Sequence, residues 1–274
     1  MPSRSAQSLC YAVLCLLLTA LAPAQAWAQE NNPVYYPLAL PGPAQLASLD
    51  TLMVYGDFLD IRISPSEDAA QILWAAQPLP HTDPAGSLPL IESEILSPTL
   101  NITDSRLIIR AESTHTHYSL NIALPATWRY QLRVYGAGDI ETIGINGNLT
   151  AWSTGGNITV REQAGRVSLT AMDGVVRAQL LEGALTGSSA ITMSHGVADD
   201  DTLIVALPDN AQATIRVRAR GTLSSDIPSL QNEQASAVEF DFSQYLEMKL
   251  NGGGAALTLR NLQGDVQLLR ALSE

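Results

Sequence analysis

The sequence predicts an all-β fold: a β-solenoid, or β-helix-like strand repeat, in a single elongated domain. The first observation is that glycine recurs every nine residues, at positions 138, 147, 156, 165, 174 and 183. The second is that apolar or small residues follow each glycine at alternate positions, which places them on one face of a short strand. The third is that no segment has the apolar periodicity of a convincing amphipathic helix. One short strand cannot bury its apolar face alone, whereas stacked copies can.

The repeated glycines mark the corners between strands. We expect each to supply a backbone with positive φ and to let successive turns approach closely. All six copies, including the last at 183–187, are expected to form strands.

Residues 1–28 have the features of a secretory signal peptide. An apolar run at 9–21 is too short to span a membrane, and an Ala-Trp-Ala motif at 26–28 is typical of a cleavage site. Both cysteines, Cys10 and Cys15, fall in this segment, so the mature chain is expected to have no thiol, disulfide or thiolate metal site. We therefore expect a periplasmic or extracellular protein, secreted through a cleavable signal peptide, with no membrane span in its mature part.

The remaining chain is predicted to have two parts. Residues 29–47 contain four prolines and little charge, which indicates an extended Pro-rich tether. Residues 48–274 form the predicted β-strand-repeat domain, and 77–89, rich in proline, is expected to be a surface loop. The first predicted strands are 51–55, 58–63, 71–76, 106–111 and 117–124.

A longer repeat has an offset of 83 residues. The segment 118–125 matches 201–208, and both end in Leu-Pro. Beyond it, Leu132 aligns with Ile215 and Gly138 with Gly221. Each copy is predicted to be a strand, a Leu-Pro turn, a second strand and a glycine corner.

These motifs resemble the DUF4097 family of adhesin-like β-strand-repeat proteins. The resemblance rests on the two Leu-Pro turns and on Gly138-Asp139-Ile140, Gly147-Asn148-Leu149, Gly156-Asn157-Ile158 and Gly264-Asp265-Val266. It covers most of the mature chain and is best over 118–226. It implies a solenoid-like domain on the bacterial envelope or outside the cell, with no established catalytic residues to transfer.

The charge composition bears on the partner. The chain has 15 basic and 27 acidic residues and a net charge of −12, which argues against nucleic acid. Within this acidic chain, Arg216, Arg218 and Arg220 alternate with apolar residues and are predicted to share one strand face. Such a strip could bind phosphates or carboxylates of an envelope polymer. The alternative is an exposed sheet face neutralised by acids such as Asp226 or Glu239.

Trp152 is the second candidate ligand-binding residue. It occupies a repeat position where most copies have a polar residue, and Ile143 holds that position one copy earlier. The two could form a platform for a sugar or a protein. Alternatively, a neighbouring loop covers Trp152.

Metal and catalytic sites are not predicted, and no cofactor is expected. Calcium-binding nonapeptide repeats need a recurring aspartate, and only Asp139 occupies that position among the six copies. The run at 199–201 is interpreted as a solvated acidic turn, and His115 with His117 as a polar strand face that lacks a third metal ligand. His195 follows a serine, but no nucleophile elbow is present.

The leading hypothesis is a non-enzymatic, adhesin-like protein of the cell envelope or the secreted fraction, which binds a polysaccharide or a protein through its solenoid surface. One alternative is a periplasmic carbohydrate-active enzyme, a polysaccharide lyase or hydrolase on a β-helix, which would need clustered acids and bases on adjacent rungs. Another is an envelope-stress accessory protein with a purely structural role.

Overall fold

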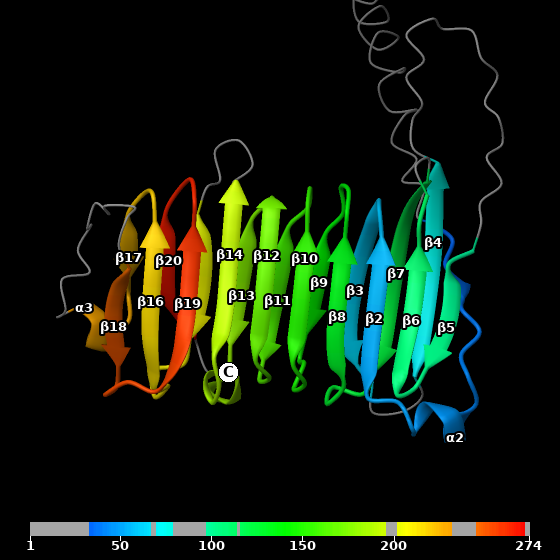
Figure 1. Cartoon of the computed structure of the whole chain (residues 1–274), viewed down its shortest axis with the longest axis horizontal. Helices are drawn as coiled ribbons and strands as arrows, with labels where there is room; N and C mark the ends of the chain where they lie inside the picture. Colours follow the sequence, from blue (N-terminus) through cyan, green and yellow to red (C-terminus); the bar gives the residue numbers. More distant parts are fainter. Residues whose placement is uncertain are drawn as a thin grey trace, which may run out of the picture. The chain divides into compact units, whose positions relative to one another are not determined.

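The computed structural model describes residues 33–66, 70–78, 97–113, 116–195, 202–231 and 245–271, and Tyr35–Glu274 forms one compact unit. The predicted signal peptide, 1–28, lies outside the described residues. The compact unit is almost entirely β-structure, arranged in two ten-stranded sheets (Figure 1). The all-β prediction is therefore confirmed.

The two sheets are named A and B. Sheet A has the order β1 (Tyr36–Pro37), β4 (Gln71–Pro78), β7 (Thr116–Leu124), β3 (Leu59–Pro65), β9 (Ile140–Ile143), β11 (Ile158–Gln163), β13 (Val176–Leu180), β15 (Leu203–Leu207), β20 (Val266–Arg270) and β17 (Leu223–Ser225). Sheet B has the order β18 (Leu246–Leu250), β16 (Ala213–Ala219), β19 (Ala255–Asn261), β14 (Ser189–His195), β12 (Val167–Asp173), β10 (Leu149–Ser153), β8 (Arg129–Val134), β2 (Thr51–Gly56), β6 (Arg106–Ala111) and β5 (Thr99–Thr103).

From β8 to β14, successive strands alternate between the two sheets. Neighbours within a sheet are parallel, and Ile140 pairs with Ile158, which pairs with Val176. On sheet B, Leu149 pairs with Val167 at the same offset of 18 residues. The nine-residue step in the sequence is thus half of the structural repeat, because each step crosses to the opposite sheet.

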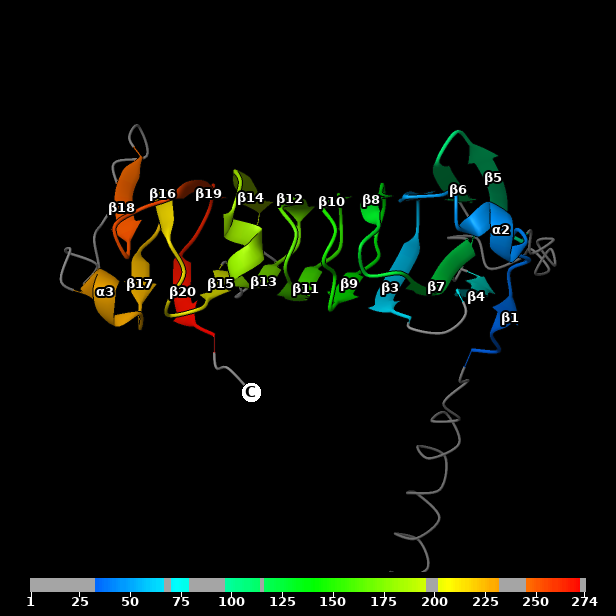
Figure 2. The same ribbon diagram turned by 90° about the horizontal axis from the view of Figure 1, so that it is seen from below.

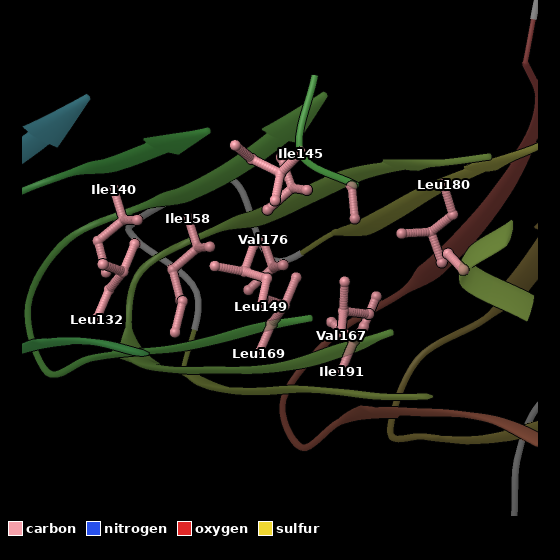
Figure 3. Packing of buried hydrophobic residues seen from close by; sticks show 14 of the residues in the cluster. Leu132, Ile140, Ile145, Leu149, Ile158, Val167, Leu169, Val176, Leu180 and Ile191 are labelled. Atoms are coloured by element: carbon pink, nitrogen blue, oxygen red, sulfur yellow. The ribbon is translucent and has the colours of Figure 1, made fainter. Parts of the chain in front are cut away.

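The core lies between the two layers (Figure 2). Inward-facing positions are fully buried, among them Leu132, Leu149 and Leu169 on sheet B and Ile140 and Ile158 on sheet A. Figure 3 shows these side chains meeting in the space between the sheets. Burying each such side chain contributes about 1.5–3 kcal/mol, so the alternating apolar positions are the main source of stability.

The repeated glycines are needed chiefly for close approach. A Cβ atom at Gly156 would overlap the carbonyl oxygen of Gly138, and one at Gly165 would overlap that of Gly147. Of the six repeated glycines, only Gly138 has a positive φ, at 155°. The expectation of positive φ at each corner is therefore wrong for the other five. The stacked turns leave no room for a side chain.

The residue after the glycine links successive turns by hydrogen bonds. Asp139 Oδ1 accepts from the backbone N–H of Asn157 at 2.8 Å, and Asn157 Oδ1 accepts from that of Val175 at 2.9 Å. Asn148 Oδ1 accepts from Arg166 N–H at 3.2 Å on the other edge. The carboxylate and amide oxygens at these positions therefore bridge the stack.

The sixth glycine copy is not a strand, which corrects the prediction. Residues Glu182–Leu185 form a 3-10 helix, η1, with Ala184 and Leu185 buried. The next strand, β14, begins at Ser189, and Ser168 pairs with Ala190 at an offset of 22 rather than 18. The extra residues insert η1 while the sheet register continues.

The ends of the stack are interleaved. Strand β2 lies between β8 and β6, although β6 and β8 follow it in the chain, and β3 lies between β7 and β9 (Figure 1). At the other end, β19 lies between β14 and β16, and β20 lies between β15 and β17. The first and last long strand pairs are thus each placed inside their end of the stack.

The 83-residue repeat corresponds to equivalent crossings. Strands β7 and β15 both belong to sheet A, and after a Leu-Pro turn β8 and β16 both belong to sheet B. In the first copy, the buried hydroxyl of Tyr130 donates to the carbonyl of Pro125 at 2.8 Å and ties the turn to β8.

Short elements depart from the prediction. The expected tether contains β1 and a single helical turn, α2 (Pro43–Leu46), which begins with a proline after Gly42. A second short helix, α3 (Pro228–Gln231), follows β17. The expected loop at 77–89 begins later, because β4 extends to Pro78, and the rest of it lies outside the described residues.

Candidate functional site

The outer face of sheet B brings the two sequence candidates onto one line of side chains. Trp152 pairs with Thr170, Thr170 with Thr192, Thr192 with Arg260, and Arg260 with Arg218. In the other direction Trp152 pairs with Arg133, Arg133 with Tyr55, and Tyr55 with Arg110. We call this line, Arg110–Tyr55–Arg133–Trp152–Thr170–Thr192–Arg260–Arg218, the Trp152 row.

One end of the Trp152 row carries an arginine–tyrosine cluster. The guanidinium carbon of Arg110 lies 5.0 Å from the ring centre of Tyr55, and that of Arg133 lies 6.0 Å from it. The two arginines lie on the strands that flank β2, in register with the tyrosine. Arg110 also pairs with Glu112 at 3.0 Å.

The other end carries a second cluster of the same kind. Arg260 lies 5.5 Å and Arg218 lies 5.8 Å from the ring centre of Tyr245, which directly precedes β18. Arg218 and Arg260 are direct partners on adjacent strands. Like charges placed directly opposite destabilise a sheet, and a ring face between cations offsets part of that effect.

Trp152 forms an aromatic platform with Tyr135. The two rings meet edge to face with centres 5.1 Å apart, and Tyr135 is 47% exposed. A shallow depression of about 330 Å³ lies against them, with Arg133, Thr150, Ser168 and Thr170 in its wall.

The predicted partnership of Trp152 with Ile143 is wrong. Ile143 lies on β9 of sheet A, whereas Trp152 lies on β10 of sheet B. Since a nine-residue step changes sheets, equivalent positions in successive copies face opposite sides of the molecule. The aromatic partner comes instead from Tyr135, just after β8.

The predicted arginine strip is only partly neutralised. Arg216 is exposed and pairs with Glu247 at 3.0 Å on the neighbouring strand β18, while Ile215 and Val217 are fully buried. Arg220 is exposed and follows the end of β16. Asp226 does not serve the strip, because its carboxylate accepts from the backbone N–H of Arg270 at 2.6 Å; Glu239 lies outside the described residues.

The strands of sheet B are basic in an acidic chain. They contain eight basic residues, Arg106, Arg110, Arg129, Arg133, Arg216, Arg218, Lys249 and Arg260. They contain two acidic residues, Asp173 and Glu247. A local surface of this sign attracts anions despite the net charge of −12.

Two histidines on the described strands pair with carboxylates. His117 Nε2 lies 3.0 Å from Asp60 Oδ2 on sheet A, and that hydrogen bond raises the pKa of His117 although partial burial opposes the rise. Burial raises the pKa of Asp60, but hydrogen bonds from His117 and the backbone of Asp139 outweigh it and lower that pKa. His195 Nδ1 lies 3.4 Å from Asp173 Oδ1 on sheet B, with both side chains mostly exposed.

The other sequence candidates bring no metal site into view. Ser194 donates to the sulfur of Met172 at 3.9 Å, so its printed partner is not the adjacent His195. His115 and the acidic run at 199–201 lie outside the described residues. Within the described ranges, no group of three or more His, Cys, Asp or Glu side chains could hold a metal ion.

Sequence reasoning missed Tyr55, Arg133, Tyr245 and Arg260. The pairing of Trp152 with Arg133 is local and could have been found by comparing residues two glycine steps apart. The other pairings join strands far apart in the chain, and no sequence signal marks them.

Comparisons with known proteins add little to this geometry. No family model and no curated protein matches the chain. The fold is similar to a crystal structure titled a "putative cell adhesion protein" from Clostridium sporogenes, with 9% identity and a TM-score of 0.44, over 87% of this chain and all of that one. Among the helices of the described residues, none is long and apolar enough to cross a membrane.

Proposed function

We propose that the chain is a two-sheeted β-solenoid that acts as a non-catalytic, adhesin-like protein of the cell envelope or the secreted fraction. Its outer face on sheet B binds an anionic polymer or a protein partner. The observation that carries this proposal is the Trp152 row, which joins Trp152 to Arg218 without interruption across sheet B. Secretion through the 1–28 signal peptide and kinship with the DUF4097 family belong to the same proposal and rest on the sequence motifs.

The distribution of acids favours binding over catalysis. Glycosidases of the common two-carboxylate type place those groups about 5–9.5 Å apart. On the strands of sheet B the acids are Asp173 on β12 and Glu247 on β18, which are four strand positions, or about 19 Å, apart. The strands around Trp152 therefore supply no such pair.

A binding experiment tests this function. Residues 29–274, which include the whole compact unit, would be applied to a glycan array and sedimented with peptidoglycan. The variant Arg216→Ser, Arg218→Ser, Arg220→Ser is expected to lose about tenfold or more in affinity, because charge-assisted hydrogen bonds are removed. Binding by the unchanged protein is expected to weaken with salt.

The matched control carries the same loss of charge on sheet A. The variant Arg62→Ser, Arg161→Ser, Arg177→Ser removes three exposed or half-buried arginines from the opposite face. Equal losses in both variants would contradict a specific role for sheet B. Release of reducing sugars from any bound polysaccharide would show that the protein is an enzyme instead.

A further inference from the structure

Two arginine–tyrosine clusters lie on the Trp152 row, on either side of its aromatic and hydroxyl centre. Tyr55 and its arginines occupy β6, β2 and β8, and Tyr245 with its arginines occupies β19, β16 and the start of β18. Four strand steps separate Arg133 from Arg260, a distance of about 19 Å at the usual strand spacing. The face therefore presents two cationic points in line, perpendicular to the strands.

Arg133 and Arg260 are not neutralised by any carboxylate within the described ranges. Their recorded side-chain contacts are with the rings of Tyr55 and Tyr245. A ring contacts the face of a guanidinium, whereas the N–H donors lie in the guanidinium plane and match a carboxylate in a bidentate arrangement. These two arginines thus have donors suited to an external anion.

The surface between the two clusters is suited to sugar. Trp152 and Tyr135 offer apolar ring surface beside the shallow depression. Hydroxyl groups surround them in two adjacent lines, Thr170 and Thr192 on the Trp152 row and Thr150, Ser168 and Thr258 on the line beside it. A protein interface core is usually more apolar than this centre.

We infer that the Trp152 row binds a carboxylated, uronate-containing polysaccharide that lies across the strands of sheet B. One carboxylate contacts Arg133 beside Tyr55, another contacts Arg260 beside Tyr245, and the intervening sugars lie on Trp152 and the hydroxyl lines. The inference rests on the proposed function and specifies the chemistry of its partner. Charge complementarity selects the anion, and the aromatic centre selects sugar over a plain polyanion.

Calorimetric titration with three defined probes tests the inference. The first is an oligogalacturonate of ten units, the second is its methyl ester, which keeps the sugar and lacks the charge, and the third is decaglutamate, which keeps the charge and lacks the sugar. Residues 29–274 are expected to bind the oligogalacturonate at least tenfold more tightly than either of the others, because both recognition elements are needed.

Two variants locate the binding on the row. Arg133→Ser with Arg260→Ser is expected to weaken oligogalacturonate binding about tenfold or more, since two charge-assisted contacts are lost. Trp152→Ala is expected to weaken it several-fold through loss of ring contact. The control, Arg161→Ser with Arg177→Ser on sheet A, removes equal charge and is expected to leave binding unchanged. Circular dichroism and thermal unfolding verify that each variant is folded.

Each other outcome overturns the inference in a distinguishable way. Decaglutamate bound as tightly as the oligogalacturonate, with Trp152→Ala silent, would mean that the face recognises charge alone, and the proposed function would stand. No binding of the oligogalacturonate, with another ligand from the array lost in the Arg216, Arg218, Arg220 variant, would overturn only the sugar assignment. No ligand dependent on sheet B in either experiment would overturn both proposals.

Discussion

The outer faces of the two sheets share one backbone plan and differ in how their charges are used. On sheet A, Glu141 lies 3.5 Å from Arg62 and 3.6 Å from Arg161, and Asp60 pairs with His117. The strands of that sheet contain four basic and three acidic residues, Arg62, Arg161, Arg177, Arg270, Asp60, Glu141 and Glu162. Most of these charges therefore have a partner of opposite sign on the same face.

Sheet B has few such partners. Its eight basic strand residues face two acidic ones, and arginines at both ends of the Trp152 row lie against tyrosine rings. Because inward positions are reserved for the core, the outward positions can vary without disturbing the stack. The contrast indicates that the repeat supplies a scaffold, and that one face of it is adapted for anions.

The largest expected effect would break the comparison altogether, because it removes the stack that both faces share. Gly156→Ala places a Cβ atom on the carbonyl oxygen of Gly138, and the backbone must move to admit it. We expect the free energy of unfolding to fall by about 3 kcal/mol, the upper range for overpacking. Urea unfolding followed by circular dichroism measures this change.

Gly42→Ala is the matched control. A Cβ atom there meets no atom within 4 Å, so unfolding is expected to be unchanged within about 0.5 kcal/mol. If both variants unfolded at the same urea concentration as the unchanged protein, close stacking at the glycine corners would not be a source of stability.

A smaller effect sharpens the comparison through pH. The hydrogen bond to Asp60 raises the pKa of His117 above its ordinary value of 6.5. The raised pKa means that the pair stabilises the folded state fully below pH 6.5, and that this contribution is lost as the pH rises through the folded pKa. Since the pair is partly exposed, we expect a loss of less than about 1 kcal/mol between pH 5.5 and 8.5.

His117→Asn isolates this contribution. The difference in unfolding free energy between the variant and the unchanged protein is expected to shrink as the pH rises over that range. A difference that stays constant would show that the ion pair on sheet A adds no pH-dependent stability.

The sequence predicted the repeat well where the interactions are local. Apolar alternation and close-packed glycines act within about twenty residues, so the strands from β8 to β13 and their buried faces followed from the pattern. The insertion of η1 escaped prediction because Gly183 keeps the nine-residue step, although the strand begins only at Ser189.

The candidate site was only half predictable. Arg216, Arg218 and Trp152 were selected from alternation and repeat position, and the strand order places Arg218 and Trp152 on one row. Tyr55 and Arg260 join that row only because β2 and β19 are inserted inside the two ends of the stack. Pairings across more than 60 residues, such as β14 with β19, depend on the tertiary fold and leave no periodic trace.

The most direct test of the central claim is the fluorescence of a single tryptophan on each sheet during titration with polygalacturonate. One protein, residues 29–274 with Trp74→Phe and Trp128→Phe, retains Trp152 on sheet B; the other, with Trp128→Phe and Trp152→Phe, retains Trp74 on β4 of sheet A. We predict that the emission of Trp152 changes saturably and returns when salt is added, while that of Trp74 stays constant. A response from Trp74 with none from Trp152 would contradict the assignment of binding to sheet B.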